Sequence, residues 1–177
     1  FCLVGSEMCI RDRFRLAGMQ PRRGQILDLL DWYARQLEQL GVEVRLNTFM
    51  EAAEISSFSA DLILIATGSY PPDTLFQKAI PHIEHLPGIE DGGFFFAEGL
   101  MARRARLGKR VLILDEGGNW KGCGTALKMA EEGHQVVFTP DPLVDKELQR
   151  TAADYPFRQK LAQLGVRFNL ESAITRW

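Results

Sequence analysis

A glycine-rich loop holds the residues whose types and spacing come closest to a ligand site. Residues 114–125 read L-D-E-G-G-N-W-K-G-C-G-T, after the apolar run 111–113 and before a helical pattern. A strand, a glycine-rich turn and a helix bring backbone N–H groups and a helix N-terminus together, where a pyrophosphate can bind. The candidate cofactor-binding residues of this loop are Asp115, Gly117, Gly118 and Gly122.

The glycine spacing departs from the G-x-G-x-x-G fingerprint of dinucleotide-binding domains. Counted from the end of the strand, the three positions hold Asp115, Gly117 and Trp120. Counted back from Gly133, the glycine that follows the predicted helix, the same three positions hold Gly117, Asn119 and Gly122. This alignment implies a loop about two residues longer than usual. Neither alignment restores three glycines.

The charges of the loop also argue against a pyridine nucleotide. Asp115 and Glu116 bring negative charge to the place of a pyrophosphate, and like charges repel strongly in a low dielectric. Thr139 and Pro140 stand where the acid that would hold the ribose is expected, and Asp141 comes one step late. Binding of NAD(P)H is therefore doubtful. Two interpretations stay open: a bound nucleotide, or a structural or docking role in which residues 119–121 meet a partner.

A second candidate site follows the apolar run 61–66, which is rich in branched residues and is predicted to be a strand buried on both faces of a parallel sheet. Ligands of such sheets bind where strands end. The candidate residues are Ala66, Thr67 and Gly68, since the glycine permits close backbone approach and the threonine hydroxyl can donate a hydrogen bond.

Other polar groups give weaker signals. His82 and His85 have no third ligand nearby, so no metal site is predicted. Cys123 stands at a predicted helix start without a second cysteine or an obvious base. The net charge of −2 gives no reason to expect nucleic acid, and no apolar run is long enough to span a membrane. A cytoplasmic location is expected.

The first residues are expected to be foreign to the gene. Residues 2–13 read C-L-V-G-S-E-M-C-I-R-D-R, which lacks the basic, apolar and cleavage regions of a signal peptide. The stretch matches, in order, the translation of an adapter used in transposase-based sequencing libraries. We therefore set residues 1–13 aside as a non-native segment, and expect the natural sequence to be truncated at both ends.

Strands alternate with helices along the rest of the chain, which predicts an α/β fold with parallel sheets. The pattern indicates helices at 22–40, 97–107, 121–132 and from about 156 to 164, and strands at 42–46, 61–66, 110–114, 135–139 and 166–170, with a possible short strand at 94–96 and a connector at 52–58. The segments Q-L-E-Q-L-G-V-E-V-R-L-N (36–47) and K-L-A-Q-L-G-V-R-F-N-L-E (160–171) repeat one unit: helix end, glycine stop, strand. Two related domains are expected, at 14–90 and 91–177.

The motifs taken together resemble one protein family. F-R-L-A-G from Phe14, the repeat at 36–47, D-L-I-L-I-A-T-G-S at 61–69, and G-K-R-V-L-I-L-D-E-G-G-N-W-K-G-C-G-T-A at 108–126 resemble the C-terminal region of NADH:flavin oxidoreductases such as trimethylamine dehydrogenase and 2,4-dienoyl-CoA reductase. The likeness implies two nested Rossmann-like domains, both incomplete here: an FAD-like domain containing residues 66–68 and an NAD(P)-like domain inserted into it. FAD or ADP would bind near residues 66–68.

The resemblance also implies a parent enzyme whose N-terminal barrel carries FMN and a 4Fe–4S cluster, so no catalytic residue is expected in this chain. The loop 115–122 resembles the trimethylamine-dehydrogenase branch, which implies oxidation or demethylation of an N-methylated amine and transfer of electrons to a partner such as an electron-transfer flavoprotein. The alternatives are an NAD(P)H-dependent flavin reductase half, as in 2,4-dienoyl-CoA reductase, and a non-catalytic docking module.

Overall fold

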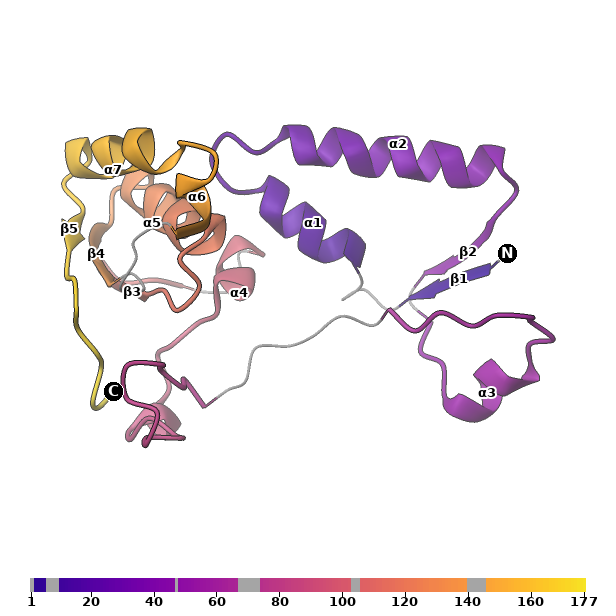
Figure 1. The fold of residues 1–177 in the computed structure, drawn as a ribbon, viewed down its shortest axis with the longest axis horizontal. Helices are drawn as coiled ribbons and strands as arrows, with labels where there is room; N and C mark the ends of the chain where they lie inside the picture. Colours follow the sequence, from indigo (N-terminus) through magenta and orange to yellow (C-terminus); the bar gives the residue numbers. More distant parts are fainter. Residues whose placement is uncertain (1, 6–9, 47, 67–73, 103–105, 140–145) are drawn as a thin grey trace. The chain divides into compact units, whose positions relative to one another are not determined.

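The computed structural model describes residues 2–5, 10–46, 48–66, 74–102, 106–139 and 146–177. The chain divides into two compact units, Phe1–Tyr70 and Pro71–Trp177, which are described separately (Figure 1).

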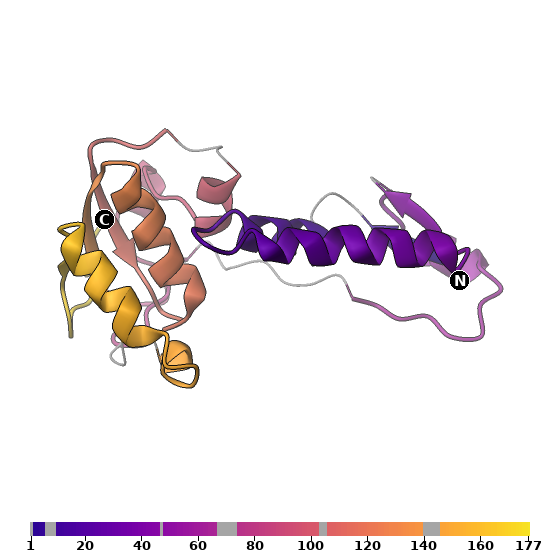
Figure 2. The same ribbon diagram turned by 90° about the horizontal axis from the view of Figure 1, so that it is seen from above.

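The second unit is built on a three-stranded parallel sheet in the order β3-β4-β5. The strands are β3 (Arg110–Leu114), β4 (Gln135–Thr139) and β5 (Arg167–Phe168). Helix α5 (Trp120–Glu131) connects β3 to β4, while α6 (Lys146–Gln149) and α7 (Asp154–Gln163) lie between β4 and β5. Helices α5 and α7 pack side by side (Figure 2), as expected when consecutive crossovers between parallel strands have the same hand.

The hydrophobic core of the second unit lies between these two helices and the sheet. Phe138 on β4 is fully buried and meets the Phe168 ring edge-on at 5.9 Å between centroids. Leu161 of α7 is also fully buried. The buried cluster is Cys123, Ala126, Leu127, Met129, Ala130, Val136, Phe138, Leu148, Leu161 and Val166. The buried thiol of Cys123, which forms no disulfide, therefore belongs to the core.

The predicted α/β pattern is confirmed in this unit. Strands β3 and β4 have the predicted bounds, and α5 begins and ends one residue earlier than predicted. Two elements are shorter: α4 covers Ala97–Met101 rather than 97–107, and β5 has two residues. Residues 94–96 are not a strand; Phe94 meets Phe96 and Trp177 edge-on instead, so ring packing takes the place of strand pairing.

The first unit contains β1 (Cys2–Gly5), α1 (Ile10–Gly18), α2 (Gln25–Gln39), β2 (Glu43–Leu46) and α3 (Ala52–Ser57). Strands β1 and β2 are parallel, and α1 packs on α2. A hydrogen bond from Arg45 lowers the pKa of the exposed Glu43 carboxyl. No apolar side chain is buried among residues 13–46 and 48–66, so this part of the unit has no hydrophobic core.

The strand predicted at 61–66 is wrong. These residues have no regular structure, and Leu62, Leu64 and Ile65 are 74%, 83% and 79% exposed. A strand exists only when a neighbouring backbone pairs with it. Within the described residues of the first unit, β1 and β2 pair with each other and not with this run. The connector at 52–58 forms helix α3.

The sequence predicts that residues 1–13 are a non-native segment, yet the structure places β1 and the beginning of α1 within them. Cys2–Gly5 pairs with Glu43–Leu46 in register. An apolar stretch of this length can extend any open strand edge, because the pairing uses backbone groups. The adapter origin of these residues stays a prediction.

The compact units divide after Tyr70, whereas the sequence placed a domain boundary at residue 90. The difference arises because residues 74–96, the first connecting segment, are bonded to the rest of the second unit: Gln77 bonds to Ile174 and Lys78 to Glu116. The assignment of the units as FAD-like and NAD(P)-like stays a prediction.

Candidate functional site: the glycine-rich loop after β3

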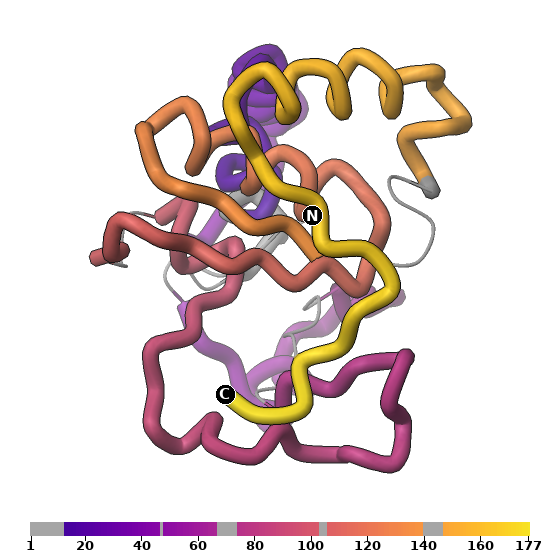
Figure 3. The backbone as a smooth tube through the Cα atoms, turned by 90° about the vertical axis from the view of Figure 1, so that its left-hand side faces the viewer, coloured from indigo at the N-terminus to yellow at the C-terminus, as the bar shows by residue number. Residues whose placement is uncertain are grey.

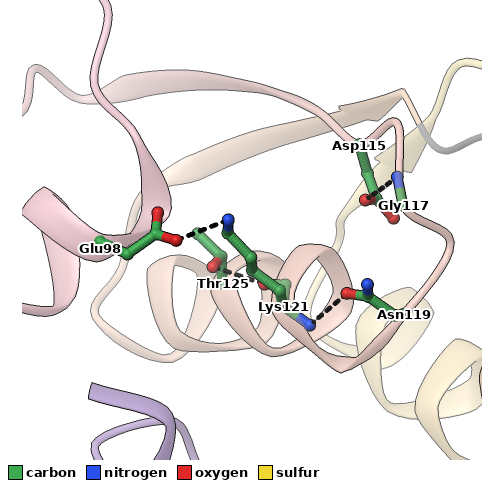
Figure 4. Close-up of polar contacts among 6 residues, drawn as sticks. All are labelled: Glu98, Asp115, Gly117, Asn119, Lys121 and Thr125. Carbon is green, nitrogen blue, oxygen red and sulfur yellow. Dashed lines mark hydrogen bonds and ion pairs between the residues drawn. The ribbon is translucent and has the colours of Figure 1, made fainter. Parts of the chain in front are cut away.

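The loop lies where the nucleotide-binding motif predicts it, at the carboxyl end of β3. The Asp115 N–H donates to the Thr139 carbonyl at 2.8 Å and extends the β3–β4 pairing by one residue. Helix α5 begins at Trp120, with Asn119 as its N-cap. The strand–loop–helix arrangement is thus complete (Figure 4).

The Asp115 carboxylate turns back into the loop. Asp115 is 7% exposed, and its Oδ1 accepts the Gly117 N–H at 3.0 Å. The same side chain packs against Gly122 in the first turn of α5: a Cβ at Gly122 would lie 2.8 Å from the Asp115 Cβ. The loop N–H group and the helix start that could meet a phosphate therefore face a carboxylate of the chain itself.

Gly122 has no side chain, so the first turn of α5 packs closely against the end of β3. Close packing of the helix against the strand is also the role of the third glycine of the fingerprint. The geometry thus agrees with the alignment counted back from the end of the helix. Gly118 is buried and has a φ of +57°, a left-handed conformation that glycine adopts without strain. Its carbonyl accepts the Glu147 N–H at 3.0 Å, and Gly117 is exposed.

Two residues from other segments, Lys78 and Glu98, contact the loop and the first turn of α5. The Glu116 Oε2 accepts the Lys78 N–H at 3.0 Å, and the Lys78 ammonium donates to the Glu116 carbonyl. The Lys121 ammonium lies 2.7 Å from Glu98 Oε1 (Figure 4). Lys78 and Glu98 were missed by the sequence analysis, because they come from a proline-rich segment and a short helix without any motif.

Trp120 is partly buried and packs on the core. Its ring meets Phe157 edge-on at 5.0 Å between centroids. The indole is thus engaged with α7, and Lys121 is the exposed member of residues 119–121.

Asn119→Ala should lower the free energy of unfolding of the second unit by about 0.5–2 kcal/mol. The Asn119 Oδ1 accepts the Lys121 N–H at 2.9 Å, and alanine leaves that N–H without its cap. Urea unfolding monitored by circular dichroism measures the loss. Asn169→Ala, at an exposed position after β5, is the matched control and should change stability little. Equal losses would contradict the capping role.

The second candidate site cannot be assembled in the same way. Ala66 is exposed, and Thr67 and Gly68 lie outside the described residues.

Within the described part of the chain, no group of three His, Cys, Asp or Glu side chains could hold a metal ion. None of its helices combines the length and apolar character that crossing a membrane requires.

Comparison with known proteins shows which proteins the chain resembles. No protein-family model matches the chain. It is 29% identical over 157 residues to a probable N-methylproline demethylase of Rhizobium meliloti, covering 88% of this chain and 21% of that protein. It is 26% identical over 166 residues to an NADH oxidase of Thermoanaerobacter brockii, covering 92% of this chain and 24% of the relative.

A histamine dehydrogenase from Rhizobium sp. 4-9 has a similar structure, with a TM-score of 0.83 and 21% identity over 98% of this chain and 26% of its own. At that identity the likeness shows the fold alone. The chain spans about a fifth to a quarter of the length of these proteins. The resemblance drawn from the motifs is confirmed by the sequence relatives, and so is the prediction of an oxidoreductase family.

Proposed function

We propose that this chain is the C-terminal scaffold region of a flavin-dependent oxidoreductase that oxidises or demethylates an N-methylated amine. The relation to a probable N-methylproline demethylase supports the substrate class. In this proposal FMN and a 4Fe–4S cluster lie in an N-terminal barrel of the parent enzyme. An adenine nucleotide, FAD or ADP, binds near residues 66–68, and the cytoplasm is the expected location.

The observation that carries the proposal is the closed glycine loop. The Asp115 carboxylate accepts the Gly117 N–H and packs against Gly122, where a dinucleotide would need open space and positive potential. These residues do not fit an NAD(P)H pyrophosphate. The second unit therefore acts as a scaffold, and reducing equivalents come from the amine rather than from a pyridine nucleotide.

The path of the chain supports nested domains. The first connecting segment leads into the second unit, and residues 169–177, the second connecting segment, follow its last strand. The two segments lie side by side (Figure 3) and are joined by hydrogen bonds between Gln77 and Ile174. A domain inserted into another one has its two connections close together, as here.

Titration of the intact parent enzyme with NADH and NADPH under anaerobic conditions tests the proposal. We expect neither nucleotide to bleach the flavin absorbance, whereas an N-methylated amine does. If either nucleotide bleached the flavin as fast as the amine does, the proposal would be contradicted.

The gene sequence upstream of Phe14 gives a second test. We expect it to encode a barrel with a C-x-x-C-x-x-x-C type of cluster motif, and the absence of such a barrel would refute the proposed parent enzyme.

One alternative has a specific observation in its favour. The relation to an NADH oxidase supports a reductase half in which the second unit binds NAD(P)H. The same titration separates the two functions.

Docking of an electron-transfer flavoprotein at residues 119–121 is compatible with either of these functions. Lys121→Ala changes the exposed member of these residues and should slow electron transfer to such an acceptor if docking occurs there, whereas an unchanged rate would exclude docking at this residue.

A further inference from the structure

Gln77 ties the two connecting segments together. Its side chain is 1% exposed, and its amide pairs twice with the backbone of Ile174. The Gln77 Nε2 donates to the Ile174 carbonyl at 2.8 Å, and the Gln77 Oε1 accepts the Ile174 N–H at 2.8 Å. Breaking either bond would leave a buried polar group without its partner, which is costly. Gln77 and Ile174 therefore move together.

Trp177 provides a second point of attachment between the same segments. Its N–H donates to the Pro87 carbonyl at 2.8 Å, and its indole Nε1 donates to the Gly92 carbonyl at 2.6 Å. Gly88 has a φ of +86°, and a Cβ there would lie 2.6 Å from the Trp177 carbonyl oxygen. The second connecting segment is thus held at Ile174 and at Trp177 against residues 77–92 (Figure 3).

Lys78, the residue after Gln77, contacts the glycine loop and not the second connecting segment. The Lys78 N–H donates to Glu116 Oε2 at 3.0 Å, and the Lys78 ammonium donates to the Glu116 carbonyl. Glu116 lies directly between Asp115 and Gly117, the pair whose hydrogen bond closes the loop. Any opening of the loop that displaces Glu116 therefore pulls on Lys78.

We propose that Gln77 and Lys78 form a clasp that couples the state of the glycine loop to the second connecting segment. The two residues are neighbours across one planar peptide bond, which fixes their Cα atoms about 3.8 Å apart. A displacement of Lys78 is therefore passed to Gln77, and from its buried amide to Ile174. The clasp transmits a change in the loop to the second connecting segment, residues 169–177, which follows β5.

Residue-resolved hydrogen exchange on the full chain tests the coupling. Glu116→Ala removes the carboxylate that holds Lys78 and should speed exchange of the Ile174 N–H by about tenfold, the size expected for one hydrogen bond. Gln77→Ala removes the direct partner of that N–H and should speed its exchange at least as much. Glu84→Ala is the matched control, an exposed glutamate of the first connecting segment, and should leave the rate unchanged.

Lys78→Met is measured beside these variants, because it removes the ammonium without touching the loop sequence. It should also speed exchange of the Ile174 N–H. The β4 amides report whether the second unit remains folded, and wild-type rates there identify the effect as local. Faster exchange of Ile174 in Gln77→Ala, with wild-type rates in both Glu116→Ala and Lys78→Met, would overturn the coupling.

Discussion

Leu161→Ala should lower the free energy of unfolding of the second unit by about 2–5 kcal/mol, and Leu37→Ala should lower that of the first unit by less than about 1 kcal/mol. The two leucines occupy the same position of the internal repeat, K-L-A-Q-L-G-V and Q-L-E-Q-L-G-V. Leu161 is fully buried, so alanine leaves a cavity there. Helix α2 has no buried residue, so removing the Leu37 side chain costs far less.

Single-tryptophan variants measure the two effects separately. Trp120 reports on the second unit in a Trp32→Phe, Trp177→Phe background, and Trp32 reports on the first unit when the other two tryptophans are replaced. Urea titrations of fluorescence then give each free energy of unfolding. Similar losses at the two positions would show that the first unit has a core of its own, contrary to the burial described above.

Gly122→Ala should destabilise the second unit by about 1–3 kcal/mol, the range for overpacking a tight site. The added methyl group would lie 2.8 Å from the Asp115 Cβ, and both atoms are fixed by the backbones of α5 and the end of β3. Thermal unfolding of the wild type and the variant measures the loss.

Two further variants show whether the contact with Asp115 is responsible. In an Asp115→Gly background the opposing Cβ is absent, so adding Gly122→Ala should cost markedly less than it does in the wild type. Gly99→Ala is the matched control in helix α4, where an added Cβ has nothing within 4 Å, and should be neutral or slightly stabilising. An equal cost of Gly122→Ala with and without Asp115 would exclude the clash as its cause.

The fold of the second unit could be predicted because its signals are local. Branched apolar runs define β3 and β4, and the spacing of apolar residues together with Gly133 defines α5. The strand predicted at 61–66 failed because the same apolar signal does not say whether another strand will pair with it. Its side chains stay exposed, and the residues that would form the candidate site beyond it include two that lie outside the described chain.

The sequence analysis names the residues of the candidate site but does not predict the conformation of the loop. The sequence showed an acid in the loop, and only the structure shows that the Asp115 carboxylate folds onto the Gly117 N–H and against Gly122. The contacts of Lys78 and Gln77 join residues 38 and 97 positions apart. Such pairs depend on the tertiary path of the connecting segments, which no local periodicity encodes.

The inward-turned carboxylate of Asp115 also bears on how the second unit responds to its surroundings. A diffusible ligand stabilises a fold in proportion to the logarithm of its concentration over its dissociation constant. An anion that is part of the chain has a fixed effective concentration instead, set by a tether of two residues to the N–H that it binds. In the proposed function, the stability of this unit is therefore independent of the cellular supply of nucleotide, and the unit keeps its shape in metabolic states that would empty an ordinary dinucleotide site.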